Sequence, residues 1–404
     1  MTAEPGRTTV RALLARPTYR RWWAASVISR AGDLLSGVAL LLLVLDRTGS
    51  GLGVAGVVVA DALPLLFAPL AGVVVDRLPR RQVMITADLV RAALAAALPL
   101  VDAHVSAIYT IAFALSTATV FFSPAANSLL PAMVGERELV AANSGVWTTA
   151  VVAQIALAPL AGVLVAAAGF AAAFWINAAS FAISAALLTG LAVPGGRVVA
   201  SSRGWLRDAL DGARLLVTDR LLRALAAAHL LAALASGATG ALLVVLARQR
   251  LGLGPKGFGW LLAATAVGAL AGPALLNRLV RDAARPGVVF GSFGLRGLVD
   301  LLLALTTRAP VAAGALVLHG AGASTGTITF TSLVQVRTEE AVRGRVFAGF
   351  DALFQTGRLV GLLLGGLLAD GLGIATVYLF GAALLLAAAL GGSALARTPD
   401  GRCP

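Results

Sequence analysis

Residues 22–45 read WWAASVISRAGDLLSGVALLLLVL, a stretch of mainly apolar side chains. An α-helix needs about 20 such residues to cross the hydrocarbon core of a bilayer. The segment before it is rich in arginine, but the stretch is too long for the core of a signal peptide and contains Arg30 and Asp33. The sequence therefore predicts a retained membrane helix here.

Similar apolar stretches follow one another along the whole chain. The 404 residues are 59% hydrophobic and 13% charged, with a mean hydropathy of +0.90, whereas soluble domains carry about 25% charged residues. This composition excludes an ordinary water-soluble enzyme. We expect twelve membrane helices, at residues 22–45, 52–75, 83–101, 105–129, 143–167, 170–193, 222–246, 258–279, 288–307, 311–334, 346–369 and 374–395.

The basic residues predict how these helices are oriented. A net charge of +13 would suggest nucleic-acid binding in a soluble chain. Outside the predicted helices, however, the Lys and Arg side chains concentrate on the side of both termini. The opposite loops hold only Arg47, Arg248, Arg250, Lys256 and Arg308. By the positive-inside rule we expect a multi-pass protein of the cell membrane with both termini in the cytoplasm, and no nucleic acid as partner.

Three segments of the first half recur in the second half in the same order. LDRTGSGLG from Leu45 recurs as LARQRLGLG from Leu246, DRLPR from Asp76 recurs as NRLVR from Asn277, and GVLVAAAG recurs as GLLADGLG. The nearly constant offset indicates a duplication. Parallel repeats of this kind occur in transporters with a binding site near the membrane midplane.

The predicted fold is all-α, with two pseudo-symmetric six-helix halves. The halves are residues 1–193 and 222–404, and residues 194–221 form a linker between them. The linker contains an arginine-rich amphipathic pattern, which predicts a helix lying at the membrane surface.

Residues 72–83, GVVVDRLPRRQV, resemble the G-x-x-x-D-R-x-x-R-R loop signature of the major facilitator superfamily. The stretches YRRWWAASVISRAGDLLSGVAL, LPLLFAPLAGVVVDR, ITADLVRA and ELVAANS resemble its macrolide-efflux and enterobactin-exporter branch. This resemblance implies an alternating-access transporter whose first, fourth, seventh and tenth helices line a central cavity. Of the antiporter motif on the fifth helix, only Pro159 and Gly162 are present.

The signature loop supplies candidate gate residues at one membrane boundary. Asp76 can accept hydrogen bonds from arginines, and pairs that break and re-form can bias a two-state equilibrium. The arginines could equally serve only to set the topology by their charge. The candidates are Asp76, Arg77, Arg80 and Arg81.

Ionisable residues inside the predicted helices are candidates for proton coupling, because such groups are costly in a bilayer and usually face the interior. Asp33 lies near the middle of the first helix, where the resemblance places the cavity. It could carry a proton, or it could form a local ion pair with Arg30, one turn away. His319 on the tenth helix could also titrate near physiological pH, or it could be a satisfied interior histidine.

The remaining intramembrane charges are expected to form ion pairs. Local spacing predicts pairing within the third and ninth helices, whereas a pair between the two halves could separate during transport. The expected pairs are Asp88 with Arg91, Arg296 with Asp300, and Asp61 with Arg358, with Asp33 as a competing partner for Arg358.

Polar and aromatic residues on the fourth and tenth helices are candidates for lining the substrate cavity. Serines and threonines that only pack helices together look the same in sequence. The candidates are Tyr109, Phe113, Ser116, Thr117, Ser324 and Thr325.

These observations predict a proton-coupled exporter of a lipophilic drug, antibiotic or siderophore. The expected partners are this small molecule, protons and membrane lipids, and the expected state is a monomer. The wide separation of the three histidines and Cys403 predicts no metal or cofactor, and no nucleophile–base motif suggests an enzyme. The alternatives are an uptake or lipid transporter of the same fold and a non-transporting receptor.

Overall fold

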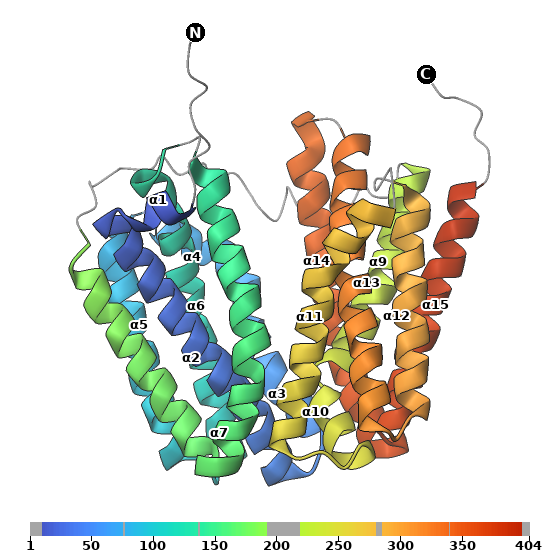
Figure 1. Ribbon diagram of the computed structural model, residues 1–404, viewed down its shortest axis with the longest axis horizontal. Coiled ribbons are helices and arrows are strands. Elements are labelled where there is room, and N and C mark those ends of the chain that lie inside the picture. The colour runs from blue at the N-terminus through green and yellow to red at the C-terminus, as the bar shows by residue number, and fades with distance from the viewer. Residues whose placement is uncertain are drawn as a thin grey trace. The chain divides into compact units, whose positions relative to one another are not determined.

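The computed structural model of the protein describes residues 10–75, 77–135, 138–191, 219–279, 285–338 and 340–397, and the regular elements in these ranges are all helices (Figure 1). The helices are α1 (Val10–Leu14), α2 (Pro17–Thr48), α3 (Gly51–Ala62), η1 (Leu63–Phe67), α4 (Ala68–Val75), α5 (Arg80–Ala97), η2 (Leu98–Leu100), α6 (Val105–Met133), α7 (Leu139–Thr189), α9 (Arg220–Gly240), α10 (Leu243–Val245), η4 (Leu246–Arg250), α11 (Pro255–Leu279), α12 (Pro286–Leu305), α13 (Ala309–Arg337), α14 (Glu340–Leu372) and α15 (Ile374–Arg397).

Ten helices of the described ranges are long and apolar enough to cross a membrane. One of them, α7, has 51 residues, or about 75 Å, which is more than twice the thickness of a bilayer core. It holds two of the predicted membrane helices, and these meet at Gly169, where a φ of 78° favours glycine. With the segment from α3 to α4, the fold has the twelve membrane helices that the sequence predicts.

The second membrane helix is interrupted, which the sequence analysis did not predict. The expected continuous helix at 52–75 is divided into α3, the short 3₁₀ turn η1 and α4. Pro64 lies in the first turn of η1. Because proline lacks an N–H group and clashes with the preceding turn, it interrupts regular α-helical hydrogen bonding at this point.

The chain divides into two compact units. Unit 1 contains residues 1–43 and 60–202, and unit 2 contains residues 44–59 and 203–404. The end of α2 and most of α3 therefore pack in unit 2, although the rest of α2 belongs to unit 1. The predicted linker lies outside the described residues, apart from residues 219–221. Of these, Arg220 and Leu221 already belong to α9, and the Asp219 side chain caps α9 by accepting a hydrogen bond from the Leu222 N–H (2.8 Å).

Unit 1 is built from α5 packed against α6 and α7, with α2 joining them (Figure 1). An apolar cluster at one end of the unit includes Tyr19, Trp22, Phe122, Leu129 and Leu188, which are all buried. This cluster fixes the ends of α2, α6 and α7 relative to one another.

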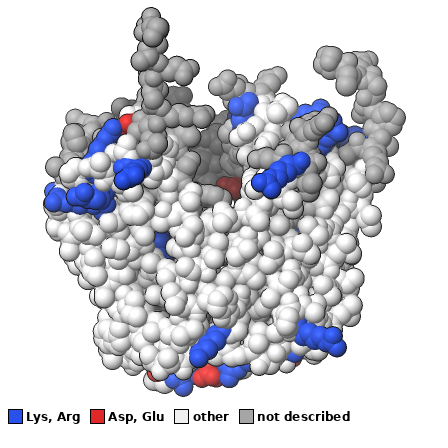
Figure 2. Space-filling model, in the orientation of Figure 1, with Lys and Arg blue, Asp and Glu red and all other residues white. Residues whose placement is uncertain are grey.

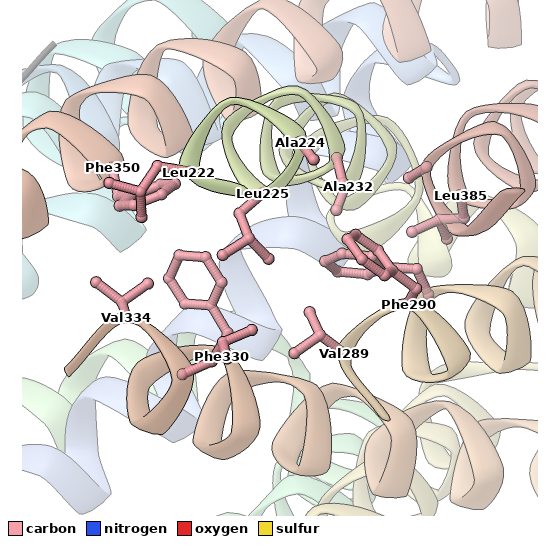
Figure 3. Close-up of a cluster of buried hydrophobic side chains, with 14 of the residues drawn as sticks. Leu222, Ala224, Leu225, Ala232, Val289, Phe290, Phe330, Val334, Phe350 and Leu385 are labelled. Carbon is pink, nitrogen blue, oxygen red and sulfur yellow. The ribbon is translucent and has the colours of Figure 1, made fainter. Parts of the chain in front are cut away.

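In unit 2, α9 packs against α14 and α15, α11 against α13, and α12 against α13 and α15. Glycine allows close approach of these helices: a Cβ added at Gly361 of α14 would lie 2.0 Å from the Leu234 carbonyl oxygen of α9. Small residues four apart permit such packing in membranes. Figure 3 shows the aromatic part of the core, where Phe330 and Phe350 meet Leu222 and Leu225 of α9.

The surface of each unit is apolar along the middle of its helices. In Figure 2 most of the visible Lys and Arg side chains of each unit lie at the helix ends, with uncharged residues between them. Exposed residues such as Trp175, Trp260 and Leu390 are half or more accessible. A surface of this kind suits hydrocarbon rather than water.

Candidate functional site

Asp33 lies in α2 beside a polar segment of α7. The Asn177 side-chain amide donates a hydrogen bond to Asp33 Oδ1, with 3.5 Å between the heavy atoms. Asn177 is buried, whereas Asp33 is exposed on the surface of α2. Within the described residues Arg30 makes no ion pair with Asp33, so the alternative of a local pair is not what the structure shows.

Gly32 allows α2 and α7 to approach at this point. A Cβ added at Gly32 would lie 2.1 Å from Ser180 Oγ and 2.4 Å from Asn177 Oδ1. Ser180 in turn donates to the Asn177 carbonyl oxygen (2.8 Å). The position of Asp33 relative to Asn177 therefore depends on the absence of a side chain at residue 32.

We expect Gly32→Ala to destabilise the protein by about 1–3 kcal/mol, the usual cost of overpacking, and to disturb the Asp33–Asn177 contact. The measurement is denaturant unfolding of the purified protein in detergent. The matched control is Gly37→Ala on the same helix, where an added Cβ meets no atom within 4 Å. Equal stability of the two variants would contradict the close approach at Gly32.

A second polar cluster in unit 1 surrounds Asp88 and Arg91 of α5. The two form an ion pair, and Ser184 of α7 donates to the other carboxylate oxygen (2.6 Å). The guanidinium lies over the rings of Phe122 and Phe181, 4.2 and 4.4 Å from their centroids. Both charged side chains are almost fully buried, at 2% and 0% exposure, so each depends on the other for compensation.

The two polar clusters of unit 1 are electrostatically connected. The charges of Arg91, Asp88 and Asp61 all act on Asp33. Asp61 belongs to unit 1 and Arg358 to unit 2, so their expected ion pair stays a prediction, as does the competing pair of Arg358 with Asp33.

Two arginines of the signature loop bind carbonyl groups of their own unit. Arg80 donates to the Ser128 carbonyl oxygen (3.3 Å), and Arg81 donates to the carbonyl oxygens of Leu188 and Thr189. The latter two end α7, where a positive charge complements the helix dipole. Arg77 is exposed. Asp76 lies outside the described residues, so the gate remains a prediction.

Arg16, just before α2, and Glu138, just before α7, form an exposed ion pair. The two terminal guanidinium nitrogens of Arg16, Nη1 and Nη2, donate to the carboxylate of Glu138, at 2.7 Å each. This hydrogen bonding raises the pKa of Arg16. Because the pair is exposed, it contributes little to stability.

An apolar groove of about 680 Å³ lies between α5 and α6. Phe113 and Thr117, two of the expected cavity residues, are among its lining residues. The Thr117 hydroxyl donates to the Phe113 carbonyl oxygen (2.8 Å), so it is satisfied within its own helix. The other lining residues are Leu78, Pro79, Gln82, Val83, Thr86, Ala87, Val90, Leu94, Ala114, Ala118 and Phe121.

The other expected cavity residues occupy different surroundings. Tyr109 is half-buried, and Ser116 is buried at 5% exposure. Ser324 of α13 faces Gly272 of α11, where an added Cβ would lie 2.4 Å from its hydroxyl oxygen, which indicates helix packing. Thr325 is half-buried, and its carbonyl oxygen accepts from the Thr329 hydroxyl (2.8 Å).

In unit 2, Arg296 and Asp300 of α12 do not form the direct local pair expected from their spacing. Arg296 instead donates to the Ser236 hydroxyl of α9 (2.7 Å). Asp300 Oδ1 lies 3.6 Å from His319 Nδ1 of α13. The physical reason is that the two side chains meet different neighbouring helices, although their charges still act on each other.

The sequence analysis missed the uncharged partners of these ionisable groups. These partners are Asn177, Ser184 and Ser236, which lie in otherwise apolar helices. A lone amide in the apolar stretch FWINAASF was a usable signal, because amides are costly in hydrocarbon unless they find a partner.

Solved structures show the same fold. The nucleoside transporter NupG superposes with a TM-score of 0.73 at 16% identity, over 94% of this chain and all of that chain. A bacterial homologue of the iron transporter ferroportin superposes with a TM-score of 0.72 at 18% identity, over 97% of this chain and all of that chain.

Sequence relatives have names that describe efflux. The multidrug efflux pump Tap of Mycobacterium tuberculosis is 29% identical over 380 residues, which are 88% of each chain. Macrolide efflux protein A of Streptococcus pyogenes is 30% identical over 133 residues, which are 30% of this chain and 33% of that protein.

Residues 8–400 match the family described as transmembrane secretion effector. The match covers nearly the whole chain, and the twelve-helix fold agrees with it. The chain therefore belongs to the transmembrane secretion effector family of the major facilitator superfamily, whose members are membrane transporters and not enzymes.

Proposed function

We propose that the protein exports lipophilic small molecules across the cell membrane in exchange for protons, by alternating access. Its similarity over 88% of its length to a multidrug efflux pump supports export of such compounds. The expected compounds are drugs, antibiotics or siderophores, and the expected topology has both termini in the cytoplasm. The protein acts as a monomer in membrane lipid.

The observation that carries the proton coupling is the environment of Asp33. An exposed carboxylate in a membrane helix has one hydrogen bond to an amide and no ion pair within the described residues. Such a group is costly unless it neutralises or faces water. It can therefore take up a proton from one side and release it to the other when the cavity opens alternately.

The groove between α5 and α6 supports a lipophilic substrate. Only Gln82, Thr86 and Thr117 contribute polar side chains to its lining. Its volume of about 680 Å³ lies within the range of pockets that hold drug-sized molecules. A compound dissolved in the membrane can enter such a groove by burying apolar surface, without an ion pair.

The test uses everted liposomes, in which the cytoplasmic face points outward, with an acidic lumen. Ethidium, erythromycin and a catechol siderophore serve as probes. Export coupled to protons accumulates a probe in the lumen, and dissipating the gradient with nigericin abolishes the accumulation. Accumulation that survives nigericin would contradict proton coupling. Accumulation only in the opposite orientation would establish uptake instead.

A further inference from the structure

Asp300 of α12 is a buried carboxylate to which no side chain or backbone group of the described residues donates a hydrogen bond. Its side chain is 1% exposed, and neither oxygen has a hydrogen-bond partner among the described residues. The nearest titratable atom is Nδ1 of His319, 3.6 Å from Oδ1, and this nitrogen is also buried without a partner. An ionised carboxylate in such a place is costly unless a cation faces it.

The other helices around Asp300 supply few groups that could satisfy it. Arg296 lies one turn earlier on α12 and donates to Ser236. The Tyr378 hydroxyl of α15 donates to the Thr239 carbonyl oxygen (3.1 Å), so its proton is already engaged. At Gly381 of α15 an added Cβ would lie 2.9 Å from Asp300 Oδ2, so no side chain fits there.

One more titratable group lies in the same region. His229 of α9 is acted on by the charge of Arg296 and stacks on Phe330, with 4.5 Å between the ring centroids. It is therefore held in an aromatic cluster and is not the partner of Asp300. Arg296 acts on the carboxylate through its charge while its Nη2 donates to Ser236, so the imidazole of His319 is the titratable side chain that lies nearest to Asp300.

We propose that His319 and Asp300 form a proton-binding site in unit 2, separate from Asp33. The imidazole takes up one proton from water at Nδ1 and donates it in a hydrogen bond to Asp300 Oδ1, and it returns this proton on release. Closing the gap from 3.6 Å to the ~2.7–2.9 Å of a charge-assisted hydrogen bond needs less than 1 Å of movement. The inference deepens the proposed proton coupling, but proton binding itself can be measured without transport.

The test is NMR of the full chain in nanodiscs with ¹⁵N-labelled histidine. The protein has three histidines, so single His→Gln variants assign the signals. We expect the His319 signal to show both the protonated and the neutral imidazole as the pH is changed. Asp300→Asn should move this transition toward lower pH by about one pH unit or more, because the anion that stabilises the imidazolium is lost. Asp300→Glu should restore it in part.

The controls separate this site from the proposed function and from misfolding. Asp33→Asn should leave the His319 transition unchanged, and the His104 signal should be the same in every folded variant. A His319 signal that keeps one protonation state throughout, or one that ignores Asp300→Asn, overturns the proposal. If the wild-type protein shows no proton-driven export but the His319 signal still responds to pH and to Asp300→Asn, the proton-binding site is supported and its role in coupling is not.

A separate observation concerns Asp370 near the end of α14, which binds the first turn of α3. Its carboxylate accepts hydrogen bonds from the Ser50 hydroxyl (2.5 Å), the Gly51 N–H (2.6 Å) and the Leu52 N–H (3.1 Å). These N–H groups begin a helix, where they need an acceptor and where the dipole favours an anion. Asp370 therefore caps a helix from a distant part of the chain.

Close packing and an ion pair accompany this cap. A Cβ added at Gly366 would lie 2.9 Å from the Leu52 Cα atom, so α14 and α3 nearly touch. Arg248 also pairs with Asp46 at the end of α2 (3.1 Å). Residues 44–59 are thus held in unit 2, whereas α3 continues into unit 1 from Ala60.

We infer that the Asp370 cap is a reversible latch that must open during each transport cycle. The helices on either side of Ser50, α2 and α3, belong in part to unit 1, so a movement of one unit against the other acts on this contact. The hydrogen bonds to Asp370 stabilise the closed state and break when it opens. This inference rests on alternating access in the proposed function.

The test replaces the latch by a disulfide. Cys403 is the only cysteine, so Cys403→Ser gives a cysteine-free background for Ser50→Cys with Asp370→Cys. Oxidation should reduce transport to the level of empty liposomes, and reduction should restore it. Each single-cysteine variant should be insensitive to oxidation. Undiminished transport by fully cross-linked protein, or no cross-link at all, overturns the latch.

A second measurement does not require a transported compound. In the same background, Asp370→Asn should raise severalfold the rate at which a maleimide labels Ser50→Cys. This factor corresponds to the free energy that one helix cap contributes. Gly371→Ala, in open space beside Asp370, should leave the rate unchanged. Equal labelling rates with Asp and with Asn at position 370 would overturn the latch, and this result does not depend on whether the protein is an exporter.

Discussion

Asp33→Asn is expected to abolish gradient-driven accumulation, leaving the signal of empty liposomes. The amide cannot bind and release a proton, so a cycle that needs this step stops. Asparagine keeps nearly the same size and can still hydrogen-bond Asn177, so folding and probe binding should persist. The measurements are probe accumulation in acidic everted liposomes and probe binding to purified protein.

The matched control is Asp102→Asn, which makes the same chemical change in the turn before α6, outside the membrane helices. It should transport normally. Probe exchange without a gradient should persist in Asp33→Asn, because exchange needs no net proton movement. Normal gradient-driven accumulation by Asp33→Asn would remove this residue from the coupling mechanism.

Arg91→Met is expected to lower the free energy of unfolding by about 3–5 kcal/mol, the usual effect of breaking a buried ion pair. The change leaves the Asp88 carboxylate buried with only the Ser184 hydroxyl as a donor. It also removes the cation from between Phe122 and Phe181. Denaturant unfolding in detergent measures the loss.

The double variant Asp88→Asn with Arg91→Met tests the cause. It removes both charges, so most of the lost stability should return. Arg16→Met is the matched control, because it breaks the exposed pair with Glu138 and should have little effect. A double variant no more stable than Arg91→Met would show that packing of the guanidinium, and not charge compensation, dominates.

The positions of the membrane helices followed from the sequence because hydropathy is a local property. The fourth helix was expected from residue 105 and the last from residue 374, and the structure begins them at Val105 and Ile374. The break between the fifth and sixth helices lies at Gly169, between the expected spans. The interruption at Pro64 was missed, although a proline inside an apolar run is a visible sign that helical hydrogen bonding changes there.

The partners of the ionisable groups did not follow from the sequence. Asn177 is 144 residues from Asp33, and Ser184 is 96 residues from Asp88. Local spacing suggested Arg296 for Asp300, whereas the structure places His319 beside it. Spacing along one helix describes neighbours on that helix only, and it says nothing of the helix packed against it.

The sequence by itself determined a membrane protein with twelve helices, its superfamily, and which charges lie within the membrane. Only the tertiary structure decided which side chains those charges meet. The physical reason is that a helix in lipid is apolar on most of its surface, so its rotation is set by packing rather than by an amphipathic pattern. At Asp33 that rotation depends on Gly32, whose missing side chain matters only because Ser180 and Asn177 lie against it.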